Sequence, residues 1–175
     1  MRIAAIDIGS NSIRLTIVDV PVAGRRIVRG EEKAYARLGH GVLESGRLAQ
    51  DAMDAAVRAL DRMMRLARER EVTHVRAVAT AAVRQATNGA AFVQRVRREV
   101  GLEIEVIDGA HEGRLALLSA VDGLALSGDV AVVDIGGGSV EIARGTGAAV
   151  SGVVSMPLGA VVLADRFGGE EPLSA

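Results

Sequence analysis

The 175-residue chain contains no cysteine, which excludes disulfides, zinc–thiolate sites and catalytic thiols. Its three aromatic residues, Tyr35, Phe92 and Phe167, are too few for the stacking surface that binds single-stranded nucleic acid. Acidic and basic residues nearly balance, at 22 and 21, so no net field attracts nucleic acid or an anionic membrane. No apolar run approaches the length of a membrane span, and Met1 leads into a strand pattern without a signal peptide. We therefore expect a globular cytoplasmic protein without nucleic-acid or membrane partners.

Two short segments repeat one pattern, an apolar strand that ends in an aspartate and a small polar turn. The first contains Asp7, Gly9, Ser10, Asn11 and Ser12, and the second contains Asp134, Gly136, Gly137, Gly138 and Ser139. Glycine leaves backbone N–H groups open to a ligand and serine adds a hydroxyl, so such a turn can cradle a phosphate. Either turn alone could be an ordinary hairpin. The pair indicates a duplicated fold that binds a phosphorylated ligand.

Apolar periodicity predicts a mixed α/β chain with two domains, 1–127 and 128–175. Strands are expected over 2–8, 13–20, 26–35, 75–78, 104–107, 130–134, 140–144 and 149–156, and helices over 48–70, 89–100, 110–126 and 157–167. Asn88 is a candidate N-cap, and Gly101 stands where its helix would stop. The inward face of 110–126 is predicted to hold Leu115, Leu118, Val121 and Leu124 or Ala125. The second domain contains fewer elements, and its open sheet edge could pair with a second copy to form a homodimer.

The two turns and the order of elements resemble the actin-like ATPase and sugar-kinase architecture, a duplicated ribonuclease H-like fold. Five stretches narrow the resemblance to the exopolyphosphatase and guanosine-pentaphosphate phosphatase (Ppx/GppA) family: 7–15, 79–86, 112–115, 134–141 and 156–160. The resemblance implies a first domain that is nearly complete and a second that is truncated. It also implies Mg²⁺-dependent hydrolysis of a terminal phosphoanhydride bond, in inorganic polyphosphate or guanosine pentaphosphate.

Five side chains outside the turns are candidates for this chemistry. Glu112 matches the family's catalytic glutamate, which activates the attacking water, although by spacing alone it is a first-turn glutamate that suits the helix dipole. Asp134 and Glu141 flank the second turn, where carboxylates can hold Mg²⁺. Arg14 and Arg84 can bind phosphate oxygens through the planar guanidinium fork.

Other residues depart from the family pattern or leave alternatives open. Ala110 and His111 stand where members often carry acids, Val140 replaces a frequent threonine, and Arg37 is a further arginine that could bind phosphate. One alternative function is a truncated, non-catalytic module that binds phosphate or polyphosphate. Another is an ATP-dependent sugar or acetate kinase, which would need an adenosine site. The sequence does not distinguish polyphosphate from guanosine pentaphosphate.

Overall fold

The computed structural model describes residues 1–21 and 26–168. The chain divides into two compact units, Met1–Val106 and Ile107–Ala175. The boundary between these units differs from the one expected between the domains 1–127 and 128–175. Compact units are not necessarily domains, so the two domains stay a prediction. None of the described helices combines the length and the hydropathy needed to cross a bilayer.

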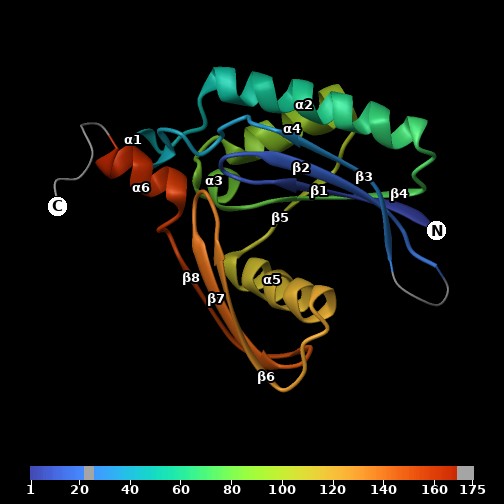
Figure 1. Cartoon of the computed structure of the whole chain (residues 1–175). Helices are drawn as coiled ribbons and strands as arrows, with labels where there is room; N and C mark the ends of the chain where they lie inside the picture. The colour runs from blue at the N-terminus through green and yellow to red at the C-terminus, as the bar shows by residue number, and fades with distance from the viewer. Residues whose placement is uncertain (22–25, 169–175) are drawn as a thin grey trace. The chain divides into compact units, whose positions relative to one another are not determined.

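The first unit is built on a five-stranded sheet with the order β3-β2-β1-β4-β5 (Figure 1). Its strands are β1 (Arg2–Ile8), β2 (Ile13–Asp19), β3 (Ile27–Ala34), β4 (His74–Ala79) and β5 (Ile104–Val106). β1, β2 and β3 form an antiparallel meander, whereas β4 and β5 run parallel to β1. The carboxyl ends of β1, β4 and β5 therefore meet at one edge of the sheet, where ligands bind in many α/β folds.

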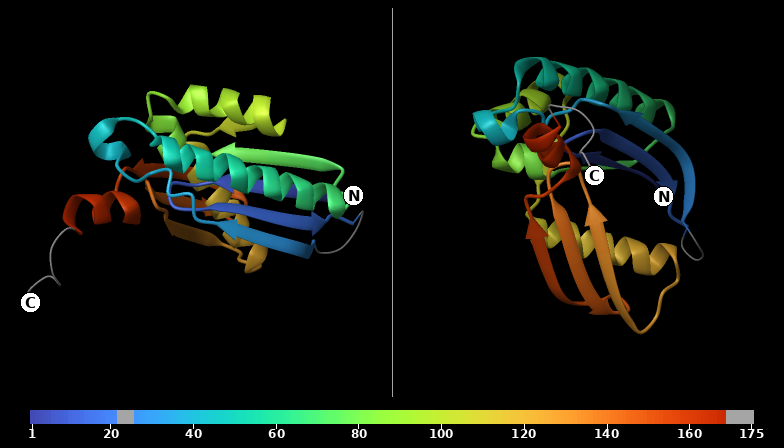
Figure 2. Two further views of the ribbon diagram at one scale, coloured as in Figure 1. Left: turned by 90° about the horizontal axis from the view of Figure 1, so that it is seen from above. Right: turned by 60° about the vertical axis from the view of Figure 1, so that its left-hand side comes forward.

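Helices cover one face of this sheet. The unit contains α1 (Val42–Ser45), α2 (Gln50–Glu69), α3 (Ala81–Gln85) and α4 (Gly89–Val100), of which α1 and α3 were not predicted. The core joins alternate strand residues such as Ile6 and Leu15 to Leu60 and Met63 of α2 and Phe92 of α4. Figure 2 shows α2 and α4 on the same side of the sheet. The opposite face of β1 and β2 is more exposed and mixed in character, so burial alternates along both strands; its residues are Ile3, Ala5, Asp7, Arg14, Thr16 and Val18.

The ends of α4 confirm one predicted signal and correct another. Gly101 lies at the C-cap with a left-handed φ of 71°, as expected for a helix stop. Asn88 occupies the N-cap position, but its side chain does not cap α4. Instead its Oδ1 accepts from the Leu48 N–H at 2.8 Å and its Nδ2 donates to the Leu48 carbonyl at 3.0 Å. The asparagine therefore ties α4 to the segment that precedes α2.

The second unit is a three-stranded antiparallel sheet that packs against one helix. Its elements are α5 (Gly109–Gly123), β6 (Asp129–Ile135), β7 (Val140–Thr146), β8 (Ala149–Met156) and α6 (Ala160–Phe167). The predicted inward face of α5 is wrong at Leu115 and Leu124, which are 41% and 71% exposed, and at the exposed Ala125, whereas Leu118 and Val121 are half-buried. The buried positions are Gly113 and Leu117, since the helix approaches the sheet through a small residue.

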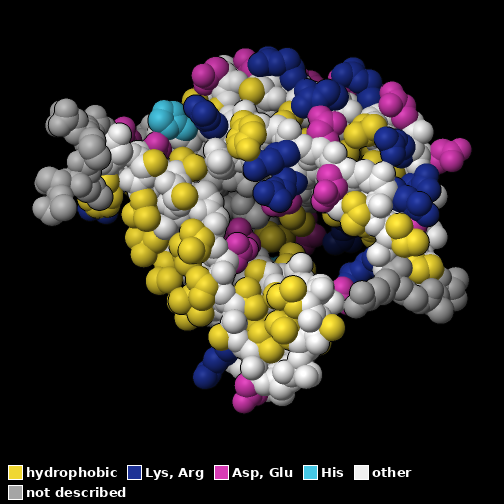
Figure 3. All heavy atoms as spheres, in the orientation of Figure 1, with side chains coloured by type: hydrophobic (Ala, Val, Ile, Leu, Met, Phe, Trp, Pro, Cys, Tyr) yellow, Lys and Arg dark blue, Asp and Glu magenta, His cyan; other side chains and the backbone are white. Residues whose placement is uncertain are grey.

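The other face of this sheet is apolar and exposed in the described part of the chain. Val133, Ile142 and Val154 are opposite one another in the ladder and are 58%, 41% and 57% exposed. Hydrophobic side chains gather over β7 and β8 in the space-filling view (Figure 3). An apolar face of this kind is a surface for further packing.

Candidate active site

The first turn joins β1 to β2 and is closed by one backbone hydrogen bond. The Gly9 N–H donates to the Ser12 carbonyl at 3.1 Å. Asp7 and Arg14 are opposite each other in the ladder on either side of the turn, and both are exposed. Directly opposed residues point to the same face of a sheet, so a carboxylate and a guanidinium stand together beside the turn.

The carbonyl groups of this turn are held from behind by the segment after β3. The Gly39 N–H donates to the Ser10 carbonyl at 2.7 Å, and the Arg37 N–H donates to the Asn11 carbonyl at 3.0 Å. In a trans peptide the N–H of the next residue points opposite to the carbonyl. The N–H groups of Asn11 and Ser12 therefore point away from this segment, as an anion-binding turn requires.

Ser10 is buried in this turn without a hydrogen-bond partner. It is 3% exposed, and its Oγ has no partner among the residues that the structure describes. Buried hydroxyls are normally hydrogen-bonded, so this atom is a candidate for contact with a bound water or ligand. Beside the turn, the Thr80 N–H donates to the Ile8 carbonyl at 3.2 Å, and α3 begins one residue later. Arg84 lies half-buried in this short helix.

The second turn joins β6 to β7 and repeats the geometry of the first. The Gly136 N–H donates to the Ser139 carbonyl at 2.9 Å, which corresponds to the bond between Gly9 and Ser12. Asp134 and Glu141 are opposite each other in the ladder. The same turn is therefore built twice, as the sequence repeat predicted, but with a glutamate in place of the arginine.

The start of α6 holds this second turn from behind. The N–H groups of Ala160 and Val161 donate to the carbonyls of Gly136 and Gly137 at 2.9 and 2.8 Å. By the trans-peptide argument, the N–H groups of Gly137 and Gly138 point away from α6. Neither N–H donates to a backbone carbonyl in the described ranges. Two adjacent amides directed to one side form the nest that binds phosphate oxygens.

Gly159 makes this approach possible. A Cβ on this residue would overlap the Gly137 carbonyl and the Gly138 carbonyl carbon. Gly39 has the same place beside the first turn, where its Cβ would lie 2.7 Å from that of Ser10. Each glycine follows a leucine that comes shortly after a strand, at Leu38 and Leu158. The repeated Leu-Gly pair is therefore a sequence signal for both glycines.

Glu141 is the most buried acid of the site. It is 1% exposed, and its Oε1 accepts a hydrogen bond from Ser155 Oγ at 2.7 Å. Its Oε2 has no partner among the described residues. Asp134, its neighbour across the ladder, is exposed. Ser155 was missed because a single serine in a strand carries no sequence signal of its own.

The first turn of α5 carries Glu112. Asp108 caps this helix, since its Oδ1 accepts from the His111 N–H at 2.7 Å, and the His111 side chain is exposed. Glu112 is half-buried. The helix N-terminus is electropositive, which favours carboxylates and phosphates at this position.

Two glycines bring α5 onto the strand residues beside the second turn. A Cβ on Gly109 would overlap the Ser155 side chain, and one on Gly113 would lie 3.3 Å from the Glu141 Cβ. The first turn of α5 therefore packs on the row that contains Glu141 and Ser155. The second unit thus gathers Glu112, Asp134, Glu141 and the glycine-rich turn, and the first unit gathers the Asp7 turn with Arg14 and α3. Among the described residues, no three His, Asp or Glu side chains form a group that could hold a metal ion by themselves.

Comparison with known proteins gives consistent matches over the whole chain. The model of the Ppx/GppA phosphatase family matches residues 17–175. Exopolyphosphatase 1 of Mycobacterium tuberculosis is 32% identical over 173 residues, which are 98% of this chain and 50% of that protein. A Ppx/GppA protein from Aquifex aeolicus is 42% identical with a TM-score of 0.84, and covers 99% of this chain and 56% of its own. An exopolyphosphatase from Cytophaga hutchinsonii is 34% identical with a TM-score of 0.93, with coverage of 99% and 56%.

The chain thus spans about half the length of the relatives it matches. Its α/β architecture is the actin-like fold that the two turns predicted, and a first domain followed by part of a second fits this coverage. The chain belongs to the Ppx/GppA phosphatase family.

Proposed function

We propose that this chain hydrolyses the terminal phosphoanhydride bond of inorganic polyphosphate, with guanosine pentaphosphate as the second candidate substrate. The observation that carries the proposal is the repeated turn, in which carbonyls are held from behind and adjacent N–H groups are directed outward. Such turns recognise phosphate oxygens and carry no preference for a base or sugar. The exopolyphosphatase names of the relatives support the same substrate class.

Both turns contribute phosphate-binding groups in this account. Gly9, Ser10, Asn11 and Ser12 in the first turn, and Gly136, Gly137, Gly138 and Ser139 in the second, supply N–H and hydroxyl donors. Asp7 orients the first turn and its neighbour Arg14, which is opposite it in the ladder. Arg14 and Arg84 balance the charge of the phosphate chain, since guanidinium groups bind phosphate through paired hydrogen bonds.

Glu112 is the proposed general base. It takes a proton from a water whose oxygen attacks the terminal phosphorus, while the bridging P–O bond breaks and the shortened chain leaves with the bond electrons. Positioned N–H donors stabilise the charge that develops on the equatorial oxygens. Glu112 is half-buried in the first turn of α5, and the next residue, Gly113, packs on Glu141, which follows the glycine-rich turn.

Mg²⁺ is the proposed cofactor, and the residues present fit it. Mg²⁺ is commonly bound by one or two carboxylates together with substrate phosphates, so a group of three acids is not required. Asp134 is exposed, and the buried Oε2 of Glu141 has no partner in the described chain, so both offer free oxygen ligands. When bound, the ion would neutralise charge on the transferred phosphoryl group. Ser155 fixes the other oxygen of Glu141 in place.

The reaction type is tested by following the fate of the phosphate. The chain is incubated with Mg²⁺ and long-chain polyphosphate or guanosine pentaphosphate, and kcat/KM for phosphate release is compared between them. Hydrolysis predicts release of free phosphate without any acceptor. Phosphate transfer to a sugar or acetate would indicate a kinase instead, and binding without turnover would indicate a phosphate-binding module.

The cytoplasmic location and the homodimer that the sequence suggested stay predictions.

A further inference from the structure

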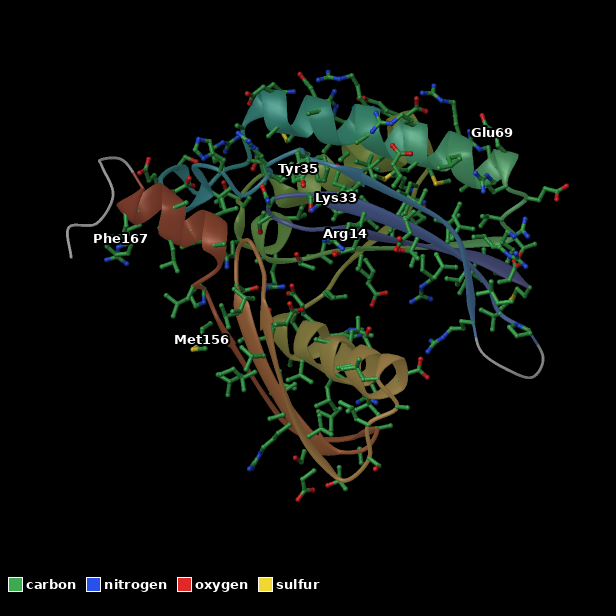
Figure 4. All side chains as sticks on the ribbon, in the orientation of Figure 1. Arg14, Lys33, Tyr35, Glu69, Met156 and Phe167 are labelled. Atoms are coloured by element: carbon green, nitrogen blue, oxygen red, sulfur yellow. The ribbon has the colours of Figure 1, made fainter. Side chains whose placement is uncertain are left out.

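Two cations stand side by side on the exposed face of the first unit's sheet. Arg14 of β2 and Lys33 of β3 are directly opposite each other in the ladder, and both are exposed. Figure 4 shows them on neighbouring strands, with Tyr35 following Lys33. Like charges in directly opposed positions destabilise a sheet. The arrangement becomes favourable when an anion binds both groups.

Acidic residues also lie near this pair, and Asp7 is opposite Arg14 on the side away from Lys33. Among the described residues, neither Arg14 nor Lys33 forms an ion pair, and Glu32 pairs with Arg62 of α2. Lys33 Nζ instead lies 4.6 Å from the centre of the Tyr35 ring, a cation–π contact that holds the ammonium near the surface. A hollow of about 290 Å³ opens here, and its lining consists of Arg14, Leu15, Thr16, Glu31, Glu32 and Lys33. Because Glu32 pairs with Arg62, Glu31 is the lining carboxylate that an anion would have to compete with.

The pair continues a row that begins beside the first phosphate-binding turn. Asp7, Arg14 and Lys33 are opposite one another across β1, β2 and β3. Adjacent strands are about 4.8 Å apart, so the backbone of Lys33 lies about 10 Å from that of Asp7. One phosphate held by the turn cannot also reach Lys33. A linear chain of phosphates can.

We propose that Arg14 and Lys33, with Tyr35 beside the ammonium, form an outer subsite for a phosphate remote from the one that is removed. The inference rests on the proposed function, because it requires a substrate with several linked phosphates. Lys33 and Tyr35 would thereby take part in binding the substrate. The subsite also makes the chain length of the substrate a determinant of affinity.

The subsite can be tested on the unmodified protein because Lys33 is the only lysine in the chain. A lysine-selective acylating reagent labels Lys33 and the terminal amine of Met1, and mass spectrometry quantifies each. Met1 is an internal control, since it precedes the start of β1 whereas Lys33 aligns with its end. Long-chain polyphosphate is expected to slow labelling of Lys33 severalfold and to leave Met1 unchanged. Equal labelling of Lys33 with and without polyphosphate would overturn the subsite.

Substitutions give a second, independent measurement. Lys33→Gln should weaken binding of long-chain polyphosphate about threefold to tenfold, while Lys33→Arg should retain it. Binding of tripolyphosphate should change by less than about twofold, because a short chain is held by the turn alone. The control is Arg68→Gln on α2, which removes one exposed positive charge from the same unit.

The outcomes separate this inference from the proposed function. If the wild type binds polyphosphate and neither Lys33→Gln nor Arg68→Gln loses affinity for it, the subsite is wrong and the proposed function stands. If both variants lose affinity equally, only overall charge matters and the subsite is again wrong. If the wild type binds no polyphosphate of any length, both proposals are contradicted.

Discussion

Gly159→Ala tests whether the glycine-rich turn depends on the close approach of α6. The added Cβ would overlap the Gly137 carbonyl and the Gly138 carbonyl carbon, which are backbone atoms that no rotamer change can move aside. Forcing a methyl group into such a contact costs about 1–3 kcal/mol. The turn must move away, and the hydrogen bonds from Ala160 and Val161 at 2.9 and 2.8 Å then lengthen. We expect the free energy of unfolding to fall by about 1–3 kcal/mol, with Tm lower by about 2–8 °C per kcal/mol.

The matched control is Gly123→Ala, another glycine substitution in the same unit. Gly123 ends α5, and a Cβ there would meet no atom within 4 Å. Alanine should raise the free energy of unfolding by about 0.4–1 kcal/mol, because it restricts the unfolded chain without strain. Urea titration measures the free energy of unfolding of both variants. Calorimetric titration measures their affinity for tripolyphosphate, which reports on the phosphate-binding turn. If Gly159→Ala has the same free energy of unfolding and the same tripolyphosphate affinity as the wild type, the close approach of Gly159 does not shape the glycine-rich turn.

Two further substitutions test the electrostatic description. Ser155→Ala removes the hydrogen bond that Ser155 Oγ donates to the buried Glu141 carboxylate, and should lower the free energy of unfolding by about 1–3 kcal/mol in urea titrations; a loss below about 0.5 kcal/mol would contradict it. Hydrogen bonds from Arg2, and then Arg29, hold the pKa of Asp19 below its usual value. Such a depressed pKa stabilises the fold above the unfolded-state value of about 3.9 and loses its effect as pH falls below it. Asp19→Asn should therefore lower Tm at neutral pH, with a gap to the wild type that narrows below about pH 4; a gap independent of pH would refute the pairing.

The strand pairs around both turns could be predicted from the sequence, because the first strand of each pair is an apolar run that ends in Asp-x-Gly. The buried face of α5 could not. Periodicity points to large apolar residues such as Leu115, whereas the contact with Glu141 is made through Gly113, which the pattern does not mark. Likewise α3 has only five residues, which are too few to show helical periodicity. It begins directly after Thr80, whose N–H still donates to the Ile8 carbonyl.

The candidate residues of the site stay predictions, and the contacts that position them could not be predicted from the sequence. Glu141 was proposed from its place after the glycine-rich turn, but its burial and its hydrogen bond to Ser155 depend on packing with α5 and β8. The same holds for Gly39 and Gly159, which act on turns that precede them by many residues. Long-range packing of this kind leaves no local signal in one sequence.

The most direct test of the central claim is phosphate release from long-chain polyphosphate with Mg²⁺, compared between the wild type and Glu112→Gln. Glu44→Gln, a first-turn glutamate of α1 in the other unit, is the control. If Glu112 is the general base, the Mg²⁺-dependent rate falls about 10²–10⁴-fold in Glu112→Gln and is unchanged in Glu44→Gln. A Glu112→Gln variant that releases phosphate as fast as the wild type, or a wild type that binds polyphosphate and releases none, would contradict this claim.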